Sequence, residues 1–228
     1  MYNSANAASV VKDHQNLSVV SDREKAREEK VFRLEEVSET RILENAPTNK
    51  TAVRMFEEKR RRLVIEKVGK EALSSELFEK ARNQIHHYNN TVAGHTLEVS
   101  EVGLHIAEIL ERHGIHVNKE EVIRTTLLHD FGIIGRHEKF KNNFVTNFQH
   151  PKDSVKEALK IYPDLSKKEQ KNIARHMFPS TFMFPTNREG WILIAADKIA
   201  SMHDVQRRFF GRRRRAEKAE QAKIASQA

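Results

Sequence analysis

The sequence predicts an all-α protein, a helical bundle preceded by a polar N-terminal extension. Apolar residues recur at three- and four-residue spacing in several segments, which is the period of an amphipathic helix. No segment shows a clear two-residue alternation of apolar and polar side chains, the pattern of a half-buried strand. Residues that begin and end helices flank the apolar runs.

Length and composition divide the chain into three parts. At 228 residues, the chain is long enough for one domain plus an extension. Hydrophobic residues make up 38% and charged residues 32%, which indicates a core diluted by polar ends. We predict a polar extension, helical or disordered, at 1–48, a helical domain at 49–206 and a basic tail at 207–228.

The composition also bears on location and on metal chemistry. No run approaches the ~20 apolar residues that span a bilayer, and the first residues lack a secretion signal pattern. We therefore expect a cytoplasmic protein without a membrane partner. Cysteine is absent, so any metal must be held by nitrogen and oxygen ligands.

The first two helices are predicted at 50–68 and 74–88, the second beginning after a serine N-cap. His86 and His87 fall at the polar end of the second helix and receive no functional role.

The third helix is predicted to begin near His95 and to end at Gly114. Val99, Val102 and Ile106 continue the spacing of His95 along one face. His95 is therefore expected to face the interior.

The fourth helix is predicted at about 119–130. Ile123, Leu127 and Asp130 share one face of it, and His129 lies beside them.

A loop of about 15 residues is predicted to follow, and long loops inside compact domains are often functional. His150 closes this loop, and Pro151 is expected in the first turn of a helix that reaches about 161. Ser166 opens the next helix with a capping box, and His176 lies on its apolar side. In the last helix Asp197 follows Ile194 by three residues, so a carboxylate lies on an apolar face.

Six residues of metal-ligand type are thus predicted to face the core: His95, His129, Asp130, His150, His176 and Asp197. Singly, His150 could cap a helix, and His176 could be a hydrogen-bonded core histidine. Together they favour a metal site, because burying unpaired ionised carboxylates is very costly. Imidazole and carboxylate ligands suit divalent metals, and six ligands exceed the needs of one ion.

The order His, then His-Asp, then a distant Asp resembles the HD-domain superfamily of metal-dependent phosphohydrolases. The matching segments are GHTLEVSEVGLHIA around His95, LLHDFG at His129-Asp130 and AADKIAS at Asp197. They span roughly 90–205. LLHDFG is similar to the bacterial HDIG variant, with Phe131 in place of isoleucine. The Gly-Tyr-Pro signature of cyclic-di-GMP phosphodiesterases is absent.

The resemblance implies an all-α HD bundle that holds one or two divalent ions, from Mn, Fe, Mg, Co, Ni or Zn. It places His95, His129, Asp130 and Asp197 on one ion. His150 and His176 fall where two-ion members carry extra histidines, and Asp130 would then bridge the ions. The implied activity is hydrolysis of a phosphoester or phosphoanhydride of a nucleotide or related small phosphate compound, by hydroxide generated at the metal.

Asp130 and Arg136 are the candidate catalytic residues. Arg136 follows the His-Asp pair in the predicted loop, with Lys139 nearby, and would bind phosphate charge; alternatively, both are surface charges. A set of phenylalanines could stack on a base or could simply cover the core: Phe140, Phe144, Phe148, Phe178, Phe182 and Phe184.

Two other functions fit parts of the sequence. The HD module could sense a nucleotide or bind a partner protein with little turnover. The basic tail at 207–228 could bind nucleic acid through phosphate contacts. The tail has no base-reading motif, and basic clusters also suit a solvated surface, so a small phosphate compound is the preferred partner. The sequence indicates no oligomeric state.

Overall fold

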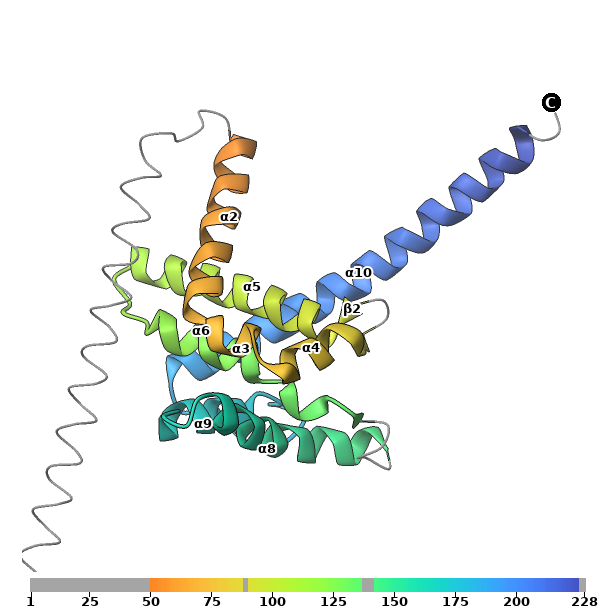
Figure 1. Cartoon of the computed structure of the whole chain (residues 1–228). Helices are drawn as coiled ribbons and strands as arrows, with labels where there is room; N and C mark the ends of the chain where they lie inside the picture. The colour runs from red at the N-terminus through yellow and green to blue at the C-terminus, as the bar shows by residue number, and fades with distance from the viewer. Residues whose placement is uncertain (1–49, 88–89, 137–141, 226–228) are drawn as a thin grey trace, which may run out of the picture. The chain divides into compact units, whose positions relative to one another are not determined.

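The computed structural model describes residues 50–87, 90–136 and 142–225, and it is almost entirely helical there (Figure 1). The predicted all-α class is confirmed; the predicted extension at 1–48 lies outside the described residues. The elements are α2 (Lys50–Val68), α3 (Lys70–Leu73), α4 (Glu76–Asn83), β1 (Ile85–His87), β2 (Asn90–Thr91), α5 (Val92–Arg112), α6 (Lys119–Leu128), η1 (Phe131–Ile133), α8 (Asn143–Ile161), α9 (Lys167–Arg175) and α10 (Arg188–Ala225).

The chain divides into two units, Met1–Arg60 and Arg61–Ala228, with the boundary inside α2. In the first unit the described residues form three turns of helix. Ion pairs of Arg54 with Glu58 and of Arg60 with Glu57 join successive turns. Such pairs on an exposed helix add little stability, because solvent and salt screen their charges.

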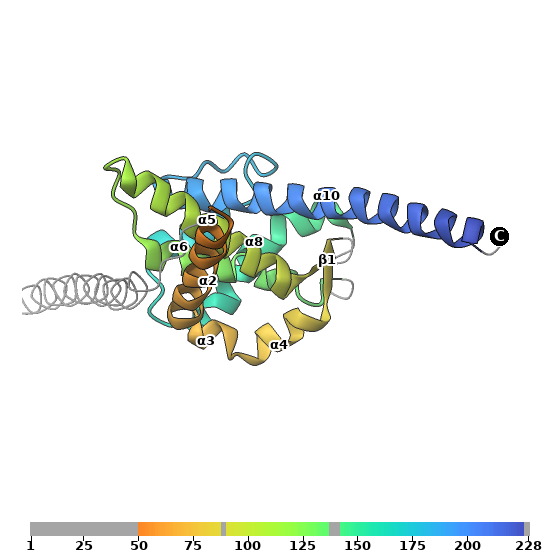
Figure 2. The same cartoon turned by 90° about the horizontal axis from the view of Figure 1, so that it is seen from above.

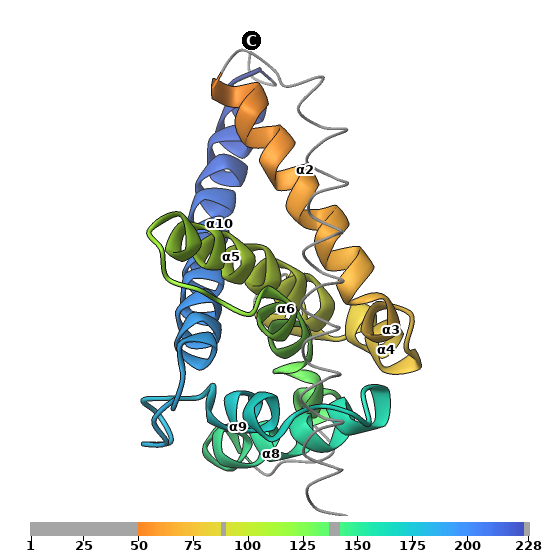
Figure 3. The same cartoon turned by 90° about the vertical axis from the view of Figure 1, so that its left-hand side faces the viewer.

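In the second unit, α5 is the central helix. It packs against α6 and against α10, and Figure 2 shows α10 running alongside it. Figures 1 and 3 both show α8 and α9 in a separate layer next to α6. The site described below lies where these two layers meet.

The apolar core explains why α5 is central. Val99, Leu104 and Ala107 are wholly buried, and each belongs to a different cluster of apolar side chains, so α5 is covered on more than one side. Thr91 caps the helix, because its side chain accepts a hydrogen bond from the Gly94 backbone. The predicted inward stripe that begins at His95 is confirmed, since His95 is also wholly buried.

The predicted helix at 74–88 is wrong in its second half. α4 ends at Asn83, and the chain turns into the β1–β2 hairpin. The cause is tertiary: the Gln84 side chain donates to the Ile133 carbonyl and accepts from the Gly135 backbone. Residues after Gln84 are thereby drawn towards η1, and His86 lies on a strand and not at a helix end.

The predicted loop before His150 is wrong in its second half. α8 begins at Asn143, after the Asn142 side chain caps its first turn, so Pro151 lies inside the helix. An interior proline costs about 3 kcal/mol. Burial offsets this cost, because Thr146, His150 and Ser154, spaced by four residues, are all buried on one face of α8.

α10 is the longest helix, with 38 residues, and spans about 57 Å. In Figure 1 it continues beyond α5. The side chains of the predicted basic tail beyond Arg207 lie outside the described part of the structure. None of the described helices combines the length and the apolar content needed to cross a membrane.

A half-exposed lysine and two buried acids tie α6, α9 and α10 together. Lys168 of α9 lies 3.0 Å from Glu121 of α6 and 2.8 Å from Glu189 of α10. The Asn172 side chain donates to Glu121. The predicted capping box of Ser166 that opens α9 is confirmed. Burial raises the pKa of Glu121 to about 7, although Lys168 acts in the opposite direction.

We predict that Glu121→Gln weakens the pH dependence of stability. Unfolded, Glu121 ionises near pH 4.5, whereas the folded protein retains the proton up to about pH 7. The free energy of unfolding therefore falls as pH rises through this window, by at most about 3 kcal/mol from this group. Glutamine can still accept the Asn172 hydrogen bond but cannot ionise.

The measurement is urea unfolding of wild type and variant between pH 4.5 and 8. Other titrating groups cancel in the comparison, and Glu66→Gln, at an exposed position of α2, is the matched control. Parallel curves for wild type and Glu121→Gln would contradict the prediction.

Candidate metal centre

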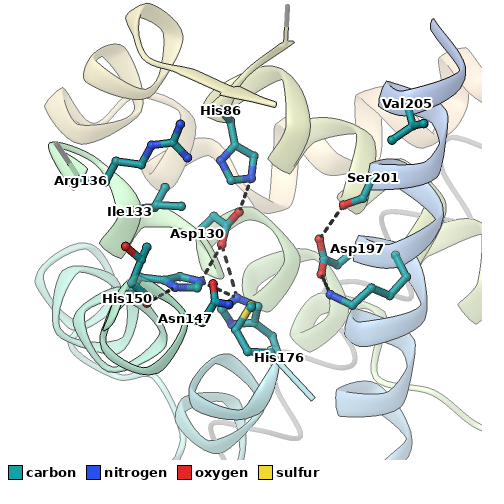
Figure 4. Close-up of a pocket in the computed structure, with 13 residues that line it drawn as sticks. His86, Asp130, Ile133, Arg136, Asn147, His150, His176, Asp197, Ser201 and Val205 are labelled. Atoms are coloured by element: carbon teal, nitrogen blue, oxygen red, sulfur yellow. Dashed lines mark hydrogen bonds and ion pairs between the residues drawn. The ribbon is translucent and has the colours of Figure 1, made fainter. Parts of the chain in front are cut away.

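The six residues predicted to bind metal come together in one place, drawn in part in Figure 4. They lie between the layer of α8 and α9 and the layer of α5, α6 and α10. None of the six is more than 6% exposed. They are His95 in the first turn of α5, His129 and Asp130 after α6, His150 in α8, His176 at the end of α9 and Asp197 in α10.

Asp130 occupies the middle of the cluster, and each of its two oxygens faces a different group. Oδ1 lies 3.3 Å from Nε2 of His150 and 3.4 Å from Nε2 of His176. These two rings approach each other closely, with 3.0 Å between their Nε2 atoms. One group therefore consists of two imidazoles and one carboxylate oxygen.

The second group surrounds the other oxygen. Oδ2 of Asp130 lies 3.4 Å from Nε2 of His129 and 3.9 Å from Nε2 of His95. Oδ1 of Asp197 lies 3.1 Å from the same atom of His95 and 3.9 Å from that of His129. Asp130 thus belongs to both groups, and it would be shared by them if the site held two ions.

Gly132 explains how α8 comes close enough for this arrangement. A Cβ atom at this position would lie 2.2 Å from the His150 carbonyl oxygen, a contact that no side chain can make. The Gly132 backbone also donates to the Ser154 hydroxyl, 2.9 Å away. Only glycine permits this approach, so the glycine of LLHDFG brings His150 next to Asp130.

The tautomers of three histidines follow from their second nitrogen. Nδ1 of His129, His150 and His176 each lies 2.7 Å from a backbone carbonyl oxygen. A carbonyl only accepts, so each Nδ1 carries a proton. In the neutral ring, Nε2 then presents a lone pair to the centre of the cluster. The carbonyls belong to Thr126, Thr146 and Ile173.

The lone pair of His129 gives the clearest indication of a bound cation. His129 is wholly buried, and its Nε2 makes no hydrogen bond to any described residue, although two carboxylates face it. Burial lowers the pKa of His129 to about 4, in spite of the charge of Asp130, so the ring is neutral at pH 7. A lone pair directed at carboxylates is repulsive, and a divalent ion between them removes the repulsion. The donor set therefore fits a metal.

Neighbouring groups also set the charge of the other members of the cluster. Burial lowers the pKa of His150, but the hydrogen bond and charge of Asp130 raise it overall. Burial opposes the ionisation of Asp130 and Asp197, but the surrounding imidazoles hold the pKa of both carboxyls below its usual range. Burial lowers the pKa of His95, but Asp197 and the other acids around it raise it to about 10. A metal must displace that proton, so metal binding at neutral pH releases a proton from His95.

His86 is a seventh member of the cluster, and the prediction that it belongs to a polar helix end is wrong. It is 7% exposed, and its Nε2 lies 3.1 Å from Oδ2 of Asp130. Its ring centroid is 4.8 Å from that of His95. His86, His95 and Asp130 could together hold a metal ion. Helical periodicity could not find His86, because it lies on a strand.

A cavity of about 690 Å³ opens beside Asp130. Arg136, the predicted phosphate-binding cation, lines it, as does Lys198, whose ammonium group lies 2.6 Å from Oδ2 of Asp197. Lys139 lies outside the described residues. The residues that line the cavity are His86, Asp130, Ile133, Arg136, Thr146, Asn147, His150, His176, Met177, Asp197, Lys198, Ser201 and Val205 (Figure 4).

The phenylalanines considered for base stacking do not line this cavity where their side chains are described. Phe178 contacts Phe184 and Trp191 instead, and Phe182 and Phe184 are exposed, so they do not cover the core either. Phe140 and the side chain of Phe144 lie outside the described part.

Comparison with known proteins agrees with the geometry. Residues 92–202 match the family model described as HD domain. All six predicted ligands fall within the match, whereas His86 precedes it. No curated protein matches the chain, and no solved structure matches it.

We predict that the purified protein retains a divalent transition metal and that Asp130→Ala loses it. The substitution removes the one carboxylate shared by both groups, and with it the oxygen that His150 and His176 both face. Metal content by mass spectrometry is the measurement. Asp153→Ala, outside the cavity on α8, is the control. Equal metal content in wild type and Asp130→Ala would end the metal hypothesis.

We also predict that His150→Ala and His176→Ala each reduce the metal stoichiometry by one ion. Both rings face Oδ1 of Asp130, whereas His95, His129 and Asp197 form the other group. Titration with Mn²⁺ measures the number of bound ions, with the exposed His113→Ala as control. Unchanged stoichiometry in both variants would leave a single-ion site.

Proposed function

We propose that this chain, a member of the HD superfamily, is a metal-dependent phosphohydrolase. HD domains are generally metal-dependent hydrolases. The proposed substrate is a phosphoester or phosphoanhydride of a nucleotide or a related small phosphate compound. Either one or two ions would be held by the six residues predicted from the sequence, with Asp130 shared between them.

The observation that carries this proposal is that imidazoles surround both oxygens of the buried Asp130 carboxylate. One oxygen faces His150 and His176, and the other faces His129 and His95. In such a site a divalent ion lowers the pKa of bound water towards 7 and neutralises charge on a phosphoryl group. Asp130 lines the cavity, which supports a reaction centre over a purely structural site.

The cavity favours a small phosphorylated substrate. Its volume of about 690 Å³ lies within the range of roughly 300–1,000 Å³ typical of small-molecule sites. The Arg136 guanidinium at its wall can donate a hydrogen bond to a phosphate oxygen. Lys198 adds positive charge on the opposite side of Asp197 from His95. His86 faces Asp130 from the cavity wall, where it would contact a substrate that reaches this carboxylate.

The test is a hydrolysis screen of the full chain reconstituted with Mn²⁺, Fe²⁺ or the other candidate ions. The panel contains phosphomonoesters, cyclic nucleotides and dinucleoside polyphosphates, and phosphate release is measured. We expect turnover of at least one class of compound. Asp130→Ala is expected to lower this turnover more than about 100-fold, because losing a shared metal ligand costs more activity than the roughly 10–100-fold typical of losing a residue that only hydrogen-bonds to a ligand. Tight nucleotide binding without turnover would instead favour the nucleotide-sensing module.

For the hydrolysed substrate, we predict that Arg136→Ala lowers kcat/KM about 10–100-fold. This range corresponds to one lost hydrogen bond to a charged group. Metal content is expected to stay at the wild-type value, because Arg136 donates and cannot bind a cation. Arg54→Ala, which alters an exposed arginine in the first unit, is the control. Wild-type kcat/KM in Arg136→Ala would remove Arg136 from the active site.

A further inference from the structure

His95 differs from the other three histidines in what its second nitrogen faces. In His129, His150 and His176, Nδ1 donates to a backbone carbonyl of the preceding turn. Nε2 of His95 likewise faces the cluster, 3.1 Å from Asp197. Its Nδ1, however, faces the side-chain carboxylate of Asp204, with 3.6 Å to Oδ2.

Asp204 is held in place from its other oxygen. It is only 4% exposed, although it belongs to the part of α10 just before the basic tail. Oδ1 accepts a hydrogen bond from the Asn90 amide at 3.0 Å and another from Arg207 at 2.6 Å. Arg207 also pairs with Glu98 of α5. Two donors therefore engage Oδ1, while Oδ2 is directed at His95.

The position of Asp204 on α10 connects it to the site. It follows Asp197 by seven residues, which is two helical turns, so both carboxylates lie on the same face of α10. One faces Nε2 of His95 and the other faces Nδ1 of the same ring. Asn90 and Asp204 both lie just outside the segment 92–202 that matches the family model, so the match assigns no role to either.

Resting on the metal-binding role proposed above for His95, we propose that Asp204 is its positioning residue. With a metal bound, the Nδ1–H of His95 would donate to Asp204, which would keep the Nε2 lone pair directed at the ion; without a metal, Nε2–H donates to Asp197. A metal-binding histidine commonly donates its other N–H to a carboxylate or carbonyl, which fixes the tautomer and the ring orientation. At 3.6 Å the two atoms form an ion-pair contact and not a hydrogen bond, so the proposal requires them to approach by ~0.5 Å when a metal binds.

This arrangement makes an unusual prediction for Asp204→Asn. The amide oxygen of the new side chain will face the two donors, Asn90 and Arg207, so its NH₂ group will point at His95. An NH₂ group opposite Nδ1 favours the tautomer whose proton sits on Nε2, and that tautomer cannot bind a metal. Asp204→Ala removes the acceptor but imposes no tautomer.

The experiment is Mn²⁺ titration of the full-length protein, followed by the electron paramagnetic resonance signal of free Mn²⁺. We expect Asp204→Asn to weaken binding of the ion near His95 by about 10–100-fold, and Asp204→Ala to weaken it less. Asp153→Asn on α8 is the matched control and should bind as the wild type does. A purely structural role predicts the opposite order, because alanine removes more packing and more hydrogen bonds than asparagine.

Far-UV circular dichroism verifies that the variants fold. Asn90→Ala, which removes one donor to Asp204 and leaves both carboxylates in place, provides a second test with a smaller expected loss of Mn²⁺ affinity. Wild-type affinity in Asp204→Asn, or a larger loss in Asp204→Ala, overturns the inference. Should Asp204→Asn not fold, wild-type affinity in Asn90→Ala overturns it. Because the readout is metal affinity, failure of the phosphohydrolase proposal leaves this test unaffected, and failure here leaves the hydrolysis screen unaffected.

Discussion

The structure depends on one buried carboxylate. Asp130 is 4% exposed and stays ionised, because imidazoles from several elements surround both of its oxygens. An ionised carboxylate in such a position is very costly unless cations or strong donors engage it. The layer of α8 and α9 is therefore joined to α5, α6 and α10 by more than apolar contact. Gly132 makes this junction possible, because no other residue permits the approach of η1 to α8.

The second nitrogen of each imidazole matters as much as the first. Three rings are oriented by backbone carbonyls within their own helical turn, so their lone pairs are directed by local structure alone. His95 sits in the first turn of α5 and faces Asp204 of α10 instead. The geometry at His95 consequently depends on the packing of α10 against α5. The same helix supplies Asp197, which gives α10 contact with both nitrogens of one ring.

Sequence periodicity located most of the site, and the reasons are physical. His95, His129 and Asp130 lie within or next to helices whose apolar faces have a regular period, so their inward direction follows from spacing. Asp197 was recognisable as a carboxylate on an otherwise apolar face. The errors concern places where tertiary contacts override local preference. Pro151 indicated a helix start, but burial along α8 carries the helix through it, and the Gln84 contacts end α4 early.

By itself, the sequence determined the all-α class, the capping of α9 and the identity of six of the clustered residues, because each depends on local spacing or on residue chemistry. The tertiary structure alone decided that His86 joins Asp130 and that Asp204 faces His95. His86 lies on a short strand, where helical periodicity carries no information. Asp204 reaches His95 across a distance of 109 residues in the chain, and only the packing of α10 on α5 fixes that contact.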